Sequence, residues 1–330
     1  MWKEHLYLLV CPQTRRQLEL INPCVDKMGA VREGILREPV SGNEYPIINY
    51  IPRFVSSHNY ADSFGYQWNA HRHTQQDSYS HVDLSKERFF KETKWSSNLA
   101  GEFILEAGSG SGRFTTQALN TGAVVASFDY SNAVEANYEM NCDYRNLLLV
   151  QADIYKIPFS HSFFDKVFCF GVLQHTPDPH AAFEAIISCL KPGGKIATDI
   201  YWKAIRRFLH IKFWLRPVTK GRSPEALYRF VRNYVDFMWP LVKLMRRNYL
   251  GQKFISRFVA DRSDQLHGAD ESLLKEWAYL DTFDWLSPVY ENPQTLKTFI
   301  LWHKDAGLIN IEVRRGYNGL EGRGTKPELS

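Results

Sequence analysis

Three glycines follow an acidic residue in the stretch ILEAGSGSGR, residues 104–113. A short apolar run ends at Glu106, and Gly108, Gly110 and Gly112 then occupy every second position. Glycine adopts backbone conformations that other residues avoid, and it lets a ligand approach the main chain closely. This spacing predicts a ligand-binding loop at the end of a β-strand.

Two kinds of phosphate-binding loop do not fit this stretch. A P-loop requires a lysine and a hydroxyl residue directly after its last glycine, whereas Arg113 and Phe114 follow here. A dinucleotide loop of the form GxGxxG requires a third glycine at the place of Arg113. A pyrophosphate is also anionic, so Glu106 beside the loop would repel it. A cationic ligand without phosphate fits better, and S-adenosylmethionine (SAM), with its sulfonium and ammonium groups, is such a ligand.

The segments around the loop alternate between strand and helix patterns. We expect strands at 103–107, 123–129, 147–153, 166–172 and 195–201, with helices at 113–122, 131–141 and 181–191 and a turn at 191–194. Such alternation predicts an α/β fold with a mostly parallel sheet and helices on both faces. Ligands of these sheets bind at the carboxyl ends of the strands, where Glu106, Asp129, Asp153 and Gly171 lie.

Five stretches resemble, in order and spacing, the motifs of class I SAM-dependent methyltransferases of the bacterial small-molecule type. They are EAGSGSG, the acidic end of AVVASFD, QAD, FGVLQHTPDP and LKPGGK, and the resemblance covers about residues 60–201. It implies a Rossmann-like sheet, SAM as cofactor with S-adenosylhomocysteine as product, and no metal. It also implies that Asp129 grips the ribose hydroxyls, that Asp153 approaches the adenine amine and that Ile154 packs on the ring. The implied cofactor-binding residues are Glu106, Gly108, Ser109, Gly110, Gly112, Asp129, Tyr130, Ser131, Asp153, Ile154 and Gly171.

Three aromatic residues precede the glycine loop on one helical face. Tyr60, Phe64 and Trp68 are spaced i, i+4, i+8, a pattern that on its own indicates core packing. The stretch also resembles a lead-in helix that closes over the cofactor in one bacterial branch of the family, so contact with the cofactor stays open.

Residues 1–55 read as a small β-rich unit of short apolar pieces between turn residues. The segment resembles the zinc-ribbon-like domains that accompany many methyltransferases. A structural zinc requires about four Cys or His ligands in paired knuckles. Here Thr14, Glu38 and Ser41 occupy three of those positions, and only Cys11 has a suitable side chain. We therefore expect a degenerate zinc-ribbon-like module without metal.

A strongly basic insertion follows residue 201. Residues 203–258 contain fourteen lysines and arginines but only two acidic residues, a net charge of +12 in a chain whose total is +4. Aliphatic and aromatic residues recur there at helical spacing, which predicts a helical cap. Its basic surface has four open interpretations: a solvated helix face, a lid for an anionic small molecule, a nucleic-acid contact, or a membrane-surface patch anchored by residues such as Trp214 and Phe237.

Candidate catalytic residues follow the fourth and fifth strands. Methyl transfer to oxygen or nitrogen requires removal of a proton or a free lone pair, and His175 can act as a base near neutral pH. Asp281 is the second candidate base. Resemblance to the substrate-facing return of the family adds Asp284, Tyr290 and His303 as substrate contacts.

The predicted organisation has four parts: residues 1–55, a SAM-binding core at 56–201, a basic helical cap at 202–290, and the end of the core at 291–330. The five cysteines are scattered and odd in number, which argues against a secreted disulfide framework. No apolar stretch reaches the length of a membrane span. We expect a cytoplasmic methyltransferase acting on O or N of a small molecule, including anionic ones. An RNA methyltransferase of the rRNA type, or a non-catalytic SAM- or partner-binding module, remains the alternative, and the oligomeric state stays open.

Overall fold

A computed structural model describes residues 1–330 except 57–58, 204–209, 220, 267 and 329–330. Its centre is a seven-stranded sheet in the order β10-β11-β9-β8-β5-β6-β7. The strands are β5 (Phe103–Ala107), β6 (Val124–Asp129), β7 (Leu147–Gln151), β8 (Phe164–Cys169), β9 (Leu190–Ile200), β10 (Ile309–Gly316) and β11 (Gly319–Thr325). β5 to β9 run parallel, and β11 pairs antiparallel with both β9 and β10. The predicted Rossmann-like α/β fold is confirmed.

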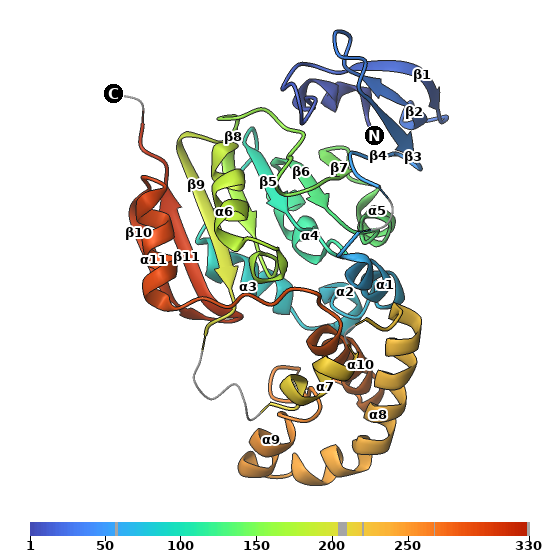
Figure 1. Ribbon diagram of the computed structural model, residues 1–330, viewed down its shortest axis with the longest axis vertical. Coiled ribbons are helices and arrows are strands. Elements are labelled where there is room, and N and C mark those ends of the chain that lie inside the picture. The colour runs from blue at the N-terminus through green and yellow to red at the C-terminus, as the bar shows by residue number, and fades with distance from the viewer. Residues whose placement is uncertain (57–58, 204–209, 220, 267, 329–330) are drawn as a thin grey trace.

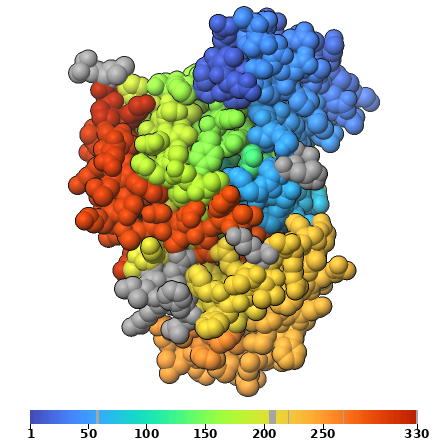
Figure 2. All heavy atoms as spheres, viewed as in Figure 1, coloured from blue at the N-terminus to red at the C-terminus, as the bar shows by residue number. Residues whose placement is uncertain are grey.

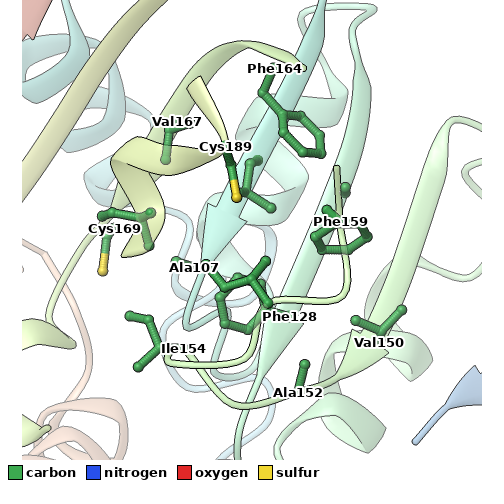
Figure 3. Close-up of a cluster of buried hydrophobic side chains, with 14 of the residues drawn as sticks. Ala107, Phe128, Val150, Ala152, Ile154, Phe159, Phe164, Val167, Cys169 and Cys189 are labelled. Carbon is green, nitrogen blue, oxygen red and sulfur yellow. The ribbon is translucent and has the colours of Figure 1, made fainter. Parts of the chain in front are cut away.

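Helices cover both faces of this sheet (Figure 1). One hydrophobic cluster joins the sheet to α6 (Pro179–Ser188) and α11 (Leu296–Asp305), and the other joins it to α3 (Leu84–Thr93), α4 (Arg113–Leu119) and α5 (Val134–Asn141). Successive strand residues point to opposite faces, so Leu105 belongs to the first cluster and its neighbour Ile104 to the second. Figure 3 shows part of the first cluster, where Phe128, Phe159 and Phe164 fill the space beside the strands.

The predicted turn at residues 191–194 is wrong in detail. β9 runs without interruption from Leu190 to Ile200 and includes both Gly193 and Gly194. Its pairing with β8 shifts register between Phe164 and Lys166, and Gly193 has a φ of +74°. The two glycines therefore form an irregularity inside the strand, because the antiparallel neighbour β11 extends the sheet over this stretch.

The N-terminal residues form a separate four-stranded sheet of β1 (Glu19–Val25), β2 (Val31–Arg37), β3 (Glu44–Ile48) and β4 (Ile51–Pro52), preceded by the 3₁₀ helix η1 (Lys3–Leu8). Cys11 Sγ lies 3.2 Å from the Tyr45 hydroxyl, and the buried Glu38 carboxylate accepts backbone hydrogen bonds from Val40 and Ser41 at 2.9 and 2.8 Å. In the described part of the chain, no three His, Cys, Asp or Glu side chains gather as a metal site. The zinc-ribbon resemblance stays a prediction.

Among the described residues after β9, the inserted cap contains α7 (Lys212–Thr219), α8 (Pro224–Met245), α9 (Tyr249–Ile255) and α10 (Glu271–Leu286). They share a hydrophobic core that includes Leu227, Val231, Trp277 and Phe283. The cap lies at one end of the molecule and the N-terminal sheet at the other (Figures 1 and 2). Among the described residues, no helix is long and apolar enough to cross a bilayer.

Three further short elements surround the carboxyl ends of the parallel strands. α1 (Asp62–Ala70) and α2 (Asp77–Ser80) precede α3, and the 3₁₀ helix η2 (Leu173–His175) follows β8. α1 packs against α5, α8 and α10, so it bridges the sheet and the cap. The division into four parts at the predicted boundaries stays a proposal, although the four-stranded sheet, the central sheet and the cap are distinct in their strand and helix packing.

Candidate active site: a cavity between the strand ends and the cap

A cavity of about 310 Å³ lies where the carboxyl ends of β5, β6 and β8 face the cap. This volume falls in the range of small-molecule sites, roughly 300–1,000 Å³. The glycine loop, α1, η2, α10 and the turn between β10 and β11 all contribute to its lining. We call the part beside the glycine loop and Asp129 its first end, and the part beside Arg88, Arg113, Arg262 and Asp284 its second end.

At the first end, the glycine loop is held by Asp129. The carboxylate accepts a hydrogen bond from Gly110 N at 2.9 Å and two from Ser131, through N at 2.8 Å and Oγ at 2.7 Å. Burial raises the pKa of Asp129, and these hydrogen bonds oppose that rise. A carboxylate has about four acceptor positions, so acceptor capacity remains toward the cavity that Asp129 lines.

Gly108 and Gly110 both line the cavity and both have positive φ angles, +81° and +53°. A Cβ at Gly108 would lie 2.2 Å from a Val172 methyl carbon, and one at Gly110 would lie 3.2 Å from the Trp68 ring. The backbone is therefore closely covered on its protein side and leaves its other side to the cavity. The other predicted cofactor residues that line the cavity are Ser109, Tyr130, Ile154 and Gly171.

Four predicted cofactor residues lie outside the cavity lining. Glu106 is fully buried and accepts hydrogen bonds from Thr115 Oγ1 at 2.5 Å and Ser127 Oγ at 2.7 Å, so it fastens α4 to β6. Ser131 donates to Asp129 through N and Oγ, and its Oγ accepts from Ala133 N at 3.2 Å.

Gly112 and Asp153 are the other two residues outside the lining. Gly112 packs against Asn137 and Asn141 of α5. The Asp153 carboxylate accepts the Tyr155 N–H at 2.9 Å, which makes it a turn cap. The structure thus places these four predicted cofactor residues outside the cavity lining, and their contact with the ligand stays a prediction.

The lead-in aromatic residues Tyr60, Phe64 and Trp68 all line the cavity. Their helical spacing places them on one face of α1 and its lead-in, and that face looks onto the glycine loop and η2. Phe64 packs on His175 with ring centres 5.0 Å apart. The pattern that resembled core packing is thus the wall of the cavity.

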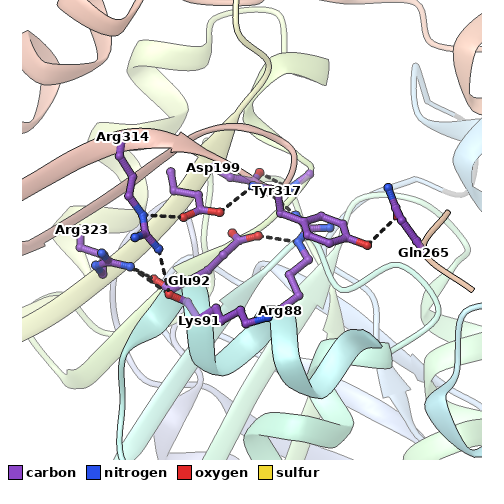
Figure 4. A network of polar contacts seen from close by, with 10 residues as sticks. Arg88, Lys91, Glu92, Asp199, Gln265, Arg314, Tyr317 and Arg323 are labelled. Atoms are coloured by element: carbon purple, nitrogen blue, oxygen red, sulfur yellow. Dashed lines mark hydrogen bonds and ion pairs between the residues drawn. The ribbon is translucent and has the colours of Figure 1, made fainter. Parts of the chain in front are cut away.

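Three arginines line the second end of the cavity, and they differ in whether a carboxylate pairs with them. Arg88 donates to Glu92 and Asp199, and Figure 4 shows this buried network together with Tyr317. Arg262 Nε donates to Asp281 Oδ2 at 2.6 Å.

Arg113 is the third of these arginines. In the described chain, it has neither an ion pair nor a side-chain hydrogen bond; its guanidinium lies over the Phe114 ring at 4.4 Å. Burial and the positive charge of Arg88 lower the pKa of Arg113 to about 10.

Asp284 lies at the same end and lines the cavity. The Tyr201 hydroxyl donates to its Oδ2 over 3.4 Å. Burial, reinforced by the neighbouring Asp281 charge, raises the pKa of Asp284 to about 6. This carboxyl group therefore holds its proton more tightly than an ordinary aspartate, and it is ionised at neutral pH.

His175 lines the cavity between Phe64 and Tyr201. Its Nδ1 donates to the Tyr290 carbonyl oxygen at 3.1 Å, because a carbonyl can only accept. Burial lowers the pKa of His175 to about 4. The ring is neutral near pH 7, with the lone pair on Nε2.

Two predicted substrate contacts lie elsewhere. His303 is completely buried on α11, where Nδ1 contacts the Phe299 carbonyl oxygen at 2.8 Å and the ring packs on Phe183. The prediction of substrate contact is wrong for His303, because α11 turns this side of the helix into the core. Tyr290 packs edge-on against Tyr60 at 5.3 Å and lies outside the cavity lining.

Several lining residues were missed from the sequence. Arg113 directly follows the glycine loop, so its position was itself a signal. Arg262 and Trp277 come from segments far along the chain, and no local pattern marks them.

Residues 105–198 match a family model described as a methyltransferase domain. Over these residues the chain carries a methyltransferase domain. Its cofactor is SAM, and the first end of the cavity fits that molecule, with a glycine loop, an acid at the β6 end and apolar groups from Ala152 and Ile154.

The relatives that this chain matches include enzymes with two different names. The chain is 27% identical over 131 residues to a tRNA U34 carboxymethyltransferase of Campylobacter curvus, a match covering 36% of this chain and 44% of the relative. It is 33% identical over 151 residues to a ubiquinone biosynthesis O-methyltransferase of Xanthomonas euvesicatoria, covering 43% and 59%. The chain thus spans about half the length of these relatives. A SAM-dependent methyltransferase structure from Aquifex aeolicus is similar with a TM-score of 0.38 and 14% identity, covering 74% of this chain and 90% of that one.

Proposed function

We propose that the protein transfers a methyl group from SAM to an oxygen or nitrogen atom of a small anionic molecule. The observation that carries this proposal is the pair of groups at the second end of the cavity, an arginine without an acidic partner and a carboxylate of raised pKa. Arg113 would bind an anionic group of the acceptor, and Asp284 would remove the proton that the acceptor loses.

The state of Arg113 supports an anionic acceptor. A cation in a partly buried cavity is costly unless it is paired, and the two neighbouring arginines both have carboxylate partners. Arg113 has none among the described residues, and its pKa of about 10 reflects that cost. A carboxylate or phosphate on the acceptor would supply the missing partner through charge-assisted hydrogen bonds.

The state of Asp284 supports its use as the general base. A base works best when its pKa lies near the working pH, and the pKa of Asp284, about 6, meets that requirement. The Tyr201 hydroxyl fixes one carboxylate oxygen.

Asp281 is the weaker candidate because Arg262 neutralises it. His175, with a pKa of about 4, would serve as a neutral hydrogen-bond acceptor through Nε2.

The first end of the cavity would align the cofactor. SAM supplies an activated methyl group that is transferred by in-line displacement, so the protein gains most from alignment. Asp129 would bind the ribose hydroxyls, Ala152 and Ile154 would contact the adenine, and the backbone at Gly108 and Gly110 would approach the methionine part. Trp68 and Phe64 would exclude water above the loop.

An RNA acceptor is the second candidate. One relative is named as a tRNA enzyme, and Arg229, Lys243, Arg247 and Lys253 of the cap are exposed without ion pairs in the described chain. Against it, Lys212, Arg216 and Arg246 of the same basic segment are occupied by internal carboxylates. Binding that weakens steeply with salt would favour RNA, because each phosphate contact releases counterions.

The experiment uses SAM labelled in its methyl group, incubated with the protein and a host-cell extract. RNA, protein and small molecules are separated, and the small molecules are passed over an anion exchanger. Label in the retained anionic fraction is the expected result, and mass spectrometry of that fraction would identify the acceptor.

The control is the Asp129→Ala variant, which keeps the second end of the cavity but loses the acid that holds the glycine loop. It should leave every fraction unlabelled. Label in the unretained neutral fraction would contradict the role of Arg113, and label in RNA would replace the proposal with the second candidate.

A further inference from the structure

The cap exposes an unusual amount of apolar surface. Twenty large hydrophobic side chains are exposed in the described chain, and eight of them lie between Trp214 and Phe254. Phe237 and Leu250 are the two most exposed of all, at 81% and 77%. Scattered exposed hydrophobic residues are normal, but a concentration of them marks an interaction surface.

α8 carries two apolar stripes on different faces. Leu227, Val231, Val235, Trp239 and Val242 are buried and form the core of the cap. Phe237, Leu241 and Leu244 are spaced i, i+4, i+7, and all are exposed. Side chains at this spacing lie on one face of a helix. This second stripe lies outside the hydrophobic core of the cap in the described chain, so packing of that core does not account for it.

The next helix continues this surface. Tyr249, Leu250 and Phe254 of α9 are exposed, and only three residues separate α9 from the end of α8. α8 and α9 also pack against each other. The exposed residues of both helices, 237–254, form what we call the cap tip, and it lies at the end of the molecule farthest from the N-terminal sheet (Figures 1 and 2).

The charge of the cap tip is entirely positive. Residues 237–260 contain no aspartate or glutamate, and they contain five basic residues, Lys243, Arg246, Arg247, Lys253 and Arg257. Lys243, Arg247 and Lys253 are exposed, and no ion pair neutralises them among the described residues. Aromatic and aliphatic side chains thus alternate with unneutralised cations on one exposed surface.

We propose that the cap tip binds the surface of a bilayer that contains anionic lipids. Helices that lie at a membrane surface combine apolar side chains with lysine and arginine, and anionic headgroups attract each basic residue near the surface. A second copy of the chain fits less well, because a symmetric contact would bring two all-positive surfaces together. The contact is peripheral, since no described helix is long and apolar enough to span a bilayer.

The test is flotation of the full-length protein with vesicles of phosphatidylcholine alone or with 30% phosphatidylglycerol. The protein should float with the anionic vesicles and stay at the bottom with the neutral ones. Replacing Lys243, Arg247 and Lys253 by Gln should lower the partition coefficient roughly fivefold for each charge removed. The triple variant F237S/L241S/L250S should also lose binding, because the apolar side chains no longer enter the interface.

The matched control changes two equally exposed apolar residues of the N-terminal sheet, Met28 and Val40, to serine; they are 70% and 74% exposed. This variant should float like the wild type. Equal flotation of the wild type and the charge variant would overturn the proposal. Sedimentation equilibrium provides a second measurement, and a wild-type dimer that F237S/L241S/L250S converts to monomers, without vesicle binding, would make the cap tip a contact between copies.

Discussion

The two ends of the cavity are built in different ways. The first end consists of backbone at the ends of neighbouring strands, where Gly108 and Gly110 have positive φ angles and Asp129 holds the loop. The second end consists of polar and charged side chains from distant segments: Arg113 begins α4, Asp284 lies on α10, and Tyr317 joins β10 to β11. In the proposed function, the first end binds the cofactor and the second end binds the acceptor.

This difference indicates which part of the fold determines specificity for the acceptor. The parallel sheet fixes the first end as soon as it forms, because ligand sites of such sheets lie at the carboxyl ends of the strands. The second end forms only when the cap packs over the sheet through α1 and α10. A substitution at the first end should therefore weaken SAM binding whichever acceptor is used. A substitution at the second end should weaken binding of the acceptor and leave SAM binding unchanged.

The largest expected effect is a loss of kcat in Asp284→Asn, a variant of the second end. Removal of a general base lowers kcat roughly 10²- to 10⁴-fold, while SAM affinity should stay unchanged. In the wild type, kcat/KM should fall as the pH drops through about 6, because protonation of Asp284 inactivates the base. A pH–rate profile of both proteins checks this, and a variant that retains the acidic limb would assign it to another group.

Asp129→Ala tests the first end. The change removes the acceptor for Gly110 N and for both Ser131 donors, and hydrogen bonds to a charged group are worth about 1.5–3 kcal/mol each. We expect the Kd for SAM to rise roughly 100-fold. Titration calorimetry measures it, with Ser131→Ala as an intermediate, since that variant loses one of the three hydrogen bonds. Unchanged SAM affinity in Asp129→Ala would remove Asp129 from the cofactor site.

Arg113→Met tests the second end at the arginine that directly follows the glycine loop. Loss of a charge-assisted contact should raise KM for the acceptor roughly 10- to 100-fold, with a small change in SAM affinity. Folding stability should not fall, because Arg113 has no ion pair or side-chain hydrogen bond to lose among the described residues. Steady-state kinetics and thermal denaturation measure both. Arg145→Met, at an exposed arginine over the Trp2 ring, is the matched control and should behave as the wild type does.

Glu106→Gln should have the smallest effect on binding. Gln can still accept from Thr115 and Ser127, so SAM affinity should change less than about threefold. Burial raises the pKa of Glu106 from 4.5 to about 7, so the folded state retains a proton that the unfolded state loses. The free energy of unfolding should therefore fall between about pH 4.5 and 7 in the wild type, and the variant should lack this contribution.

Denaturation of Glu106→Gln at pH 5 and pH 8 measures the stability difference. A loss of SAM affinity as large as that of Asp129→Ala would return Glu106 to the ligand site, where the sequence had placed it.

The sequence predicted the fold, since the fold depends on local patterns. The alternation of strand and helix defines the sheet, and Gly108, Gly110, Asp129 and Ile154 lie at or shortly after strand ends and line the cavity. Glu106, Gly112, Ser131 and Asp153 come from the same segments but lie outside the lining. A pattern gives the position along a strand, whereas the partner of a side chain depends on packing against α4 and α5.

The second end could not be predicted to the same degree. Asp281 and Asp284 were both singled out, but their roles differ only because Arg262, nineteen positions before Asp281, pairs with one of them. His303 was assigned to the substrate, yet α11 buries it against Phe183. Tyr317 reaches the cavity through the pairing of β10 with β11. Long-range contacts of this kind leave no periodic trace in the sequence.

Equilibrium binding of SAM to the wild type, Asp129→Ala and Arg113→Met tests the division of the cavity most directly. SAM itself carries a carboxylate, so Arg113 must be shown to serve the acceptor rather than the cofactor. The account predicts a large loss of affinity in Asp129→Ala and a change of less than about threefold in Arg113→Met. If Arg113→Met loses SAM as strongly as Asp129→Ala does, Arg113 belongs to the cofactor end and the argument for an anionic acceptor fails.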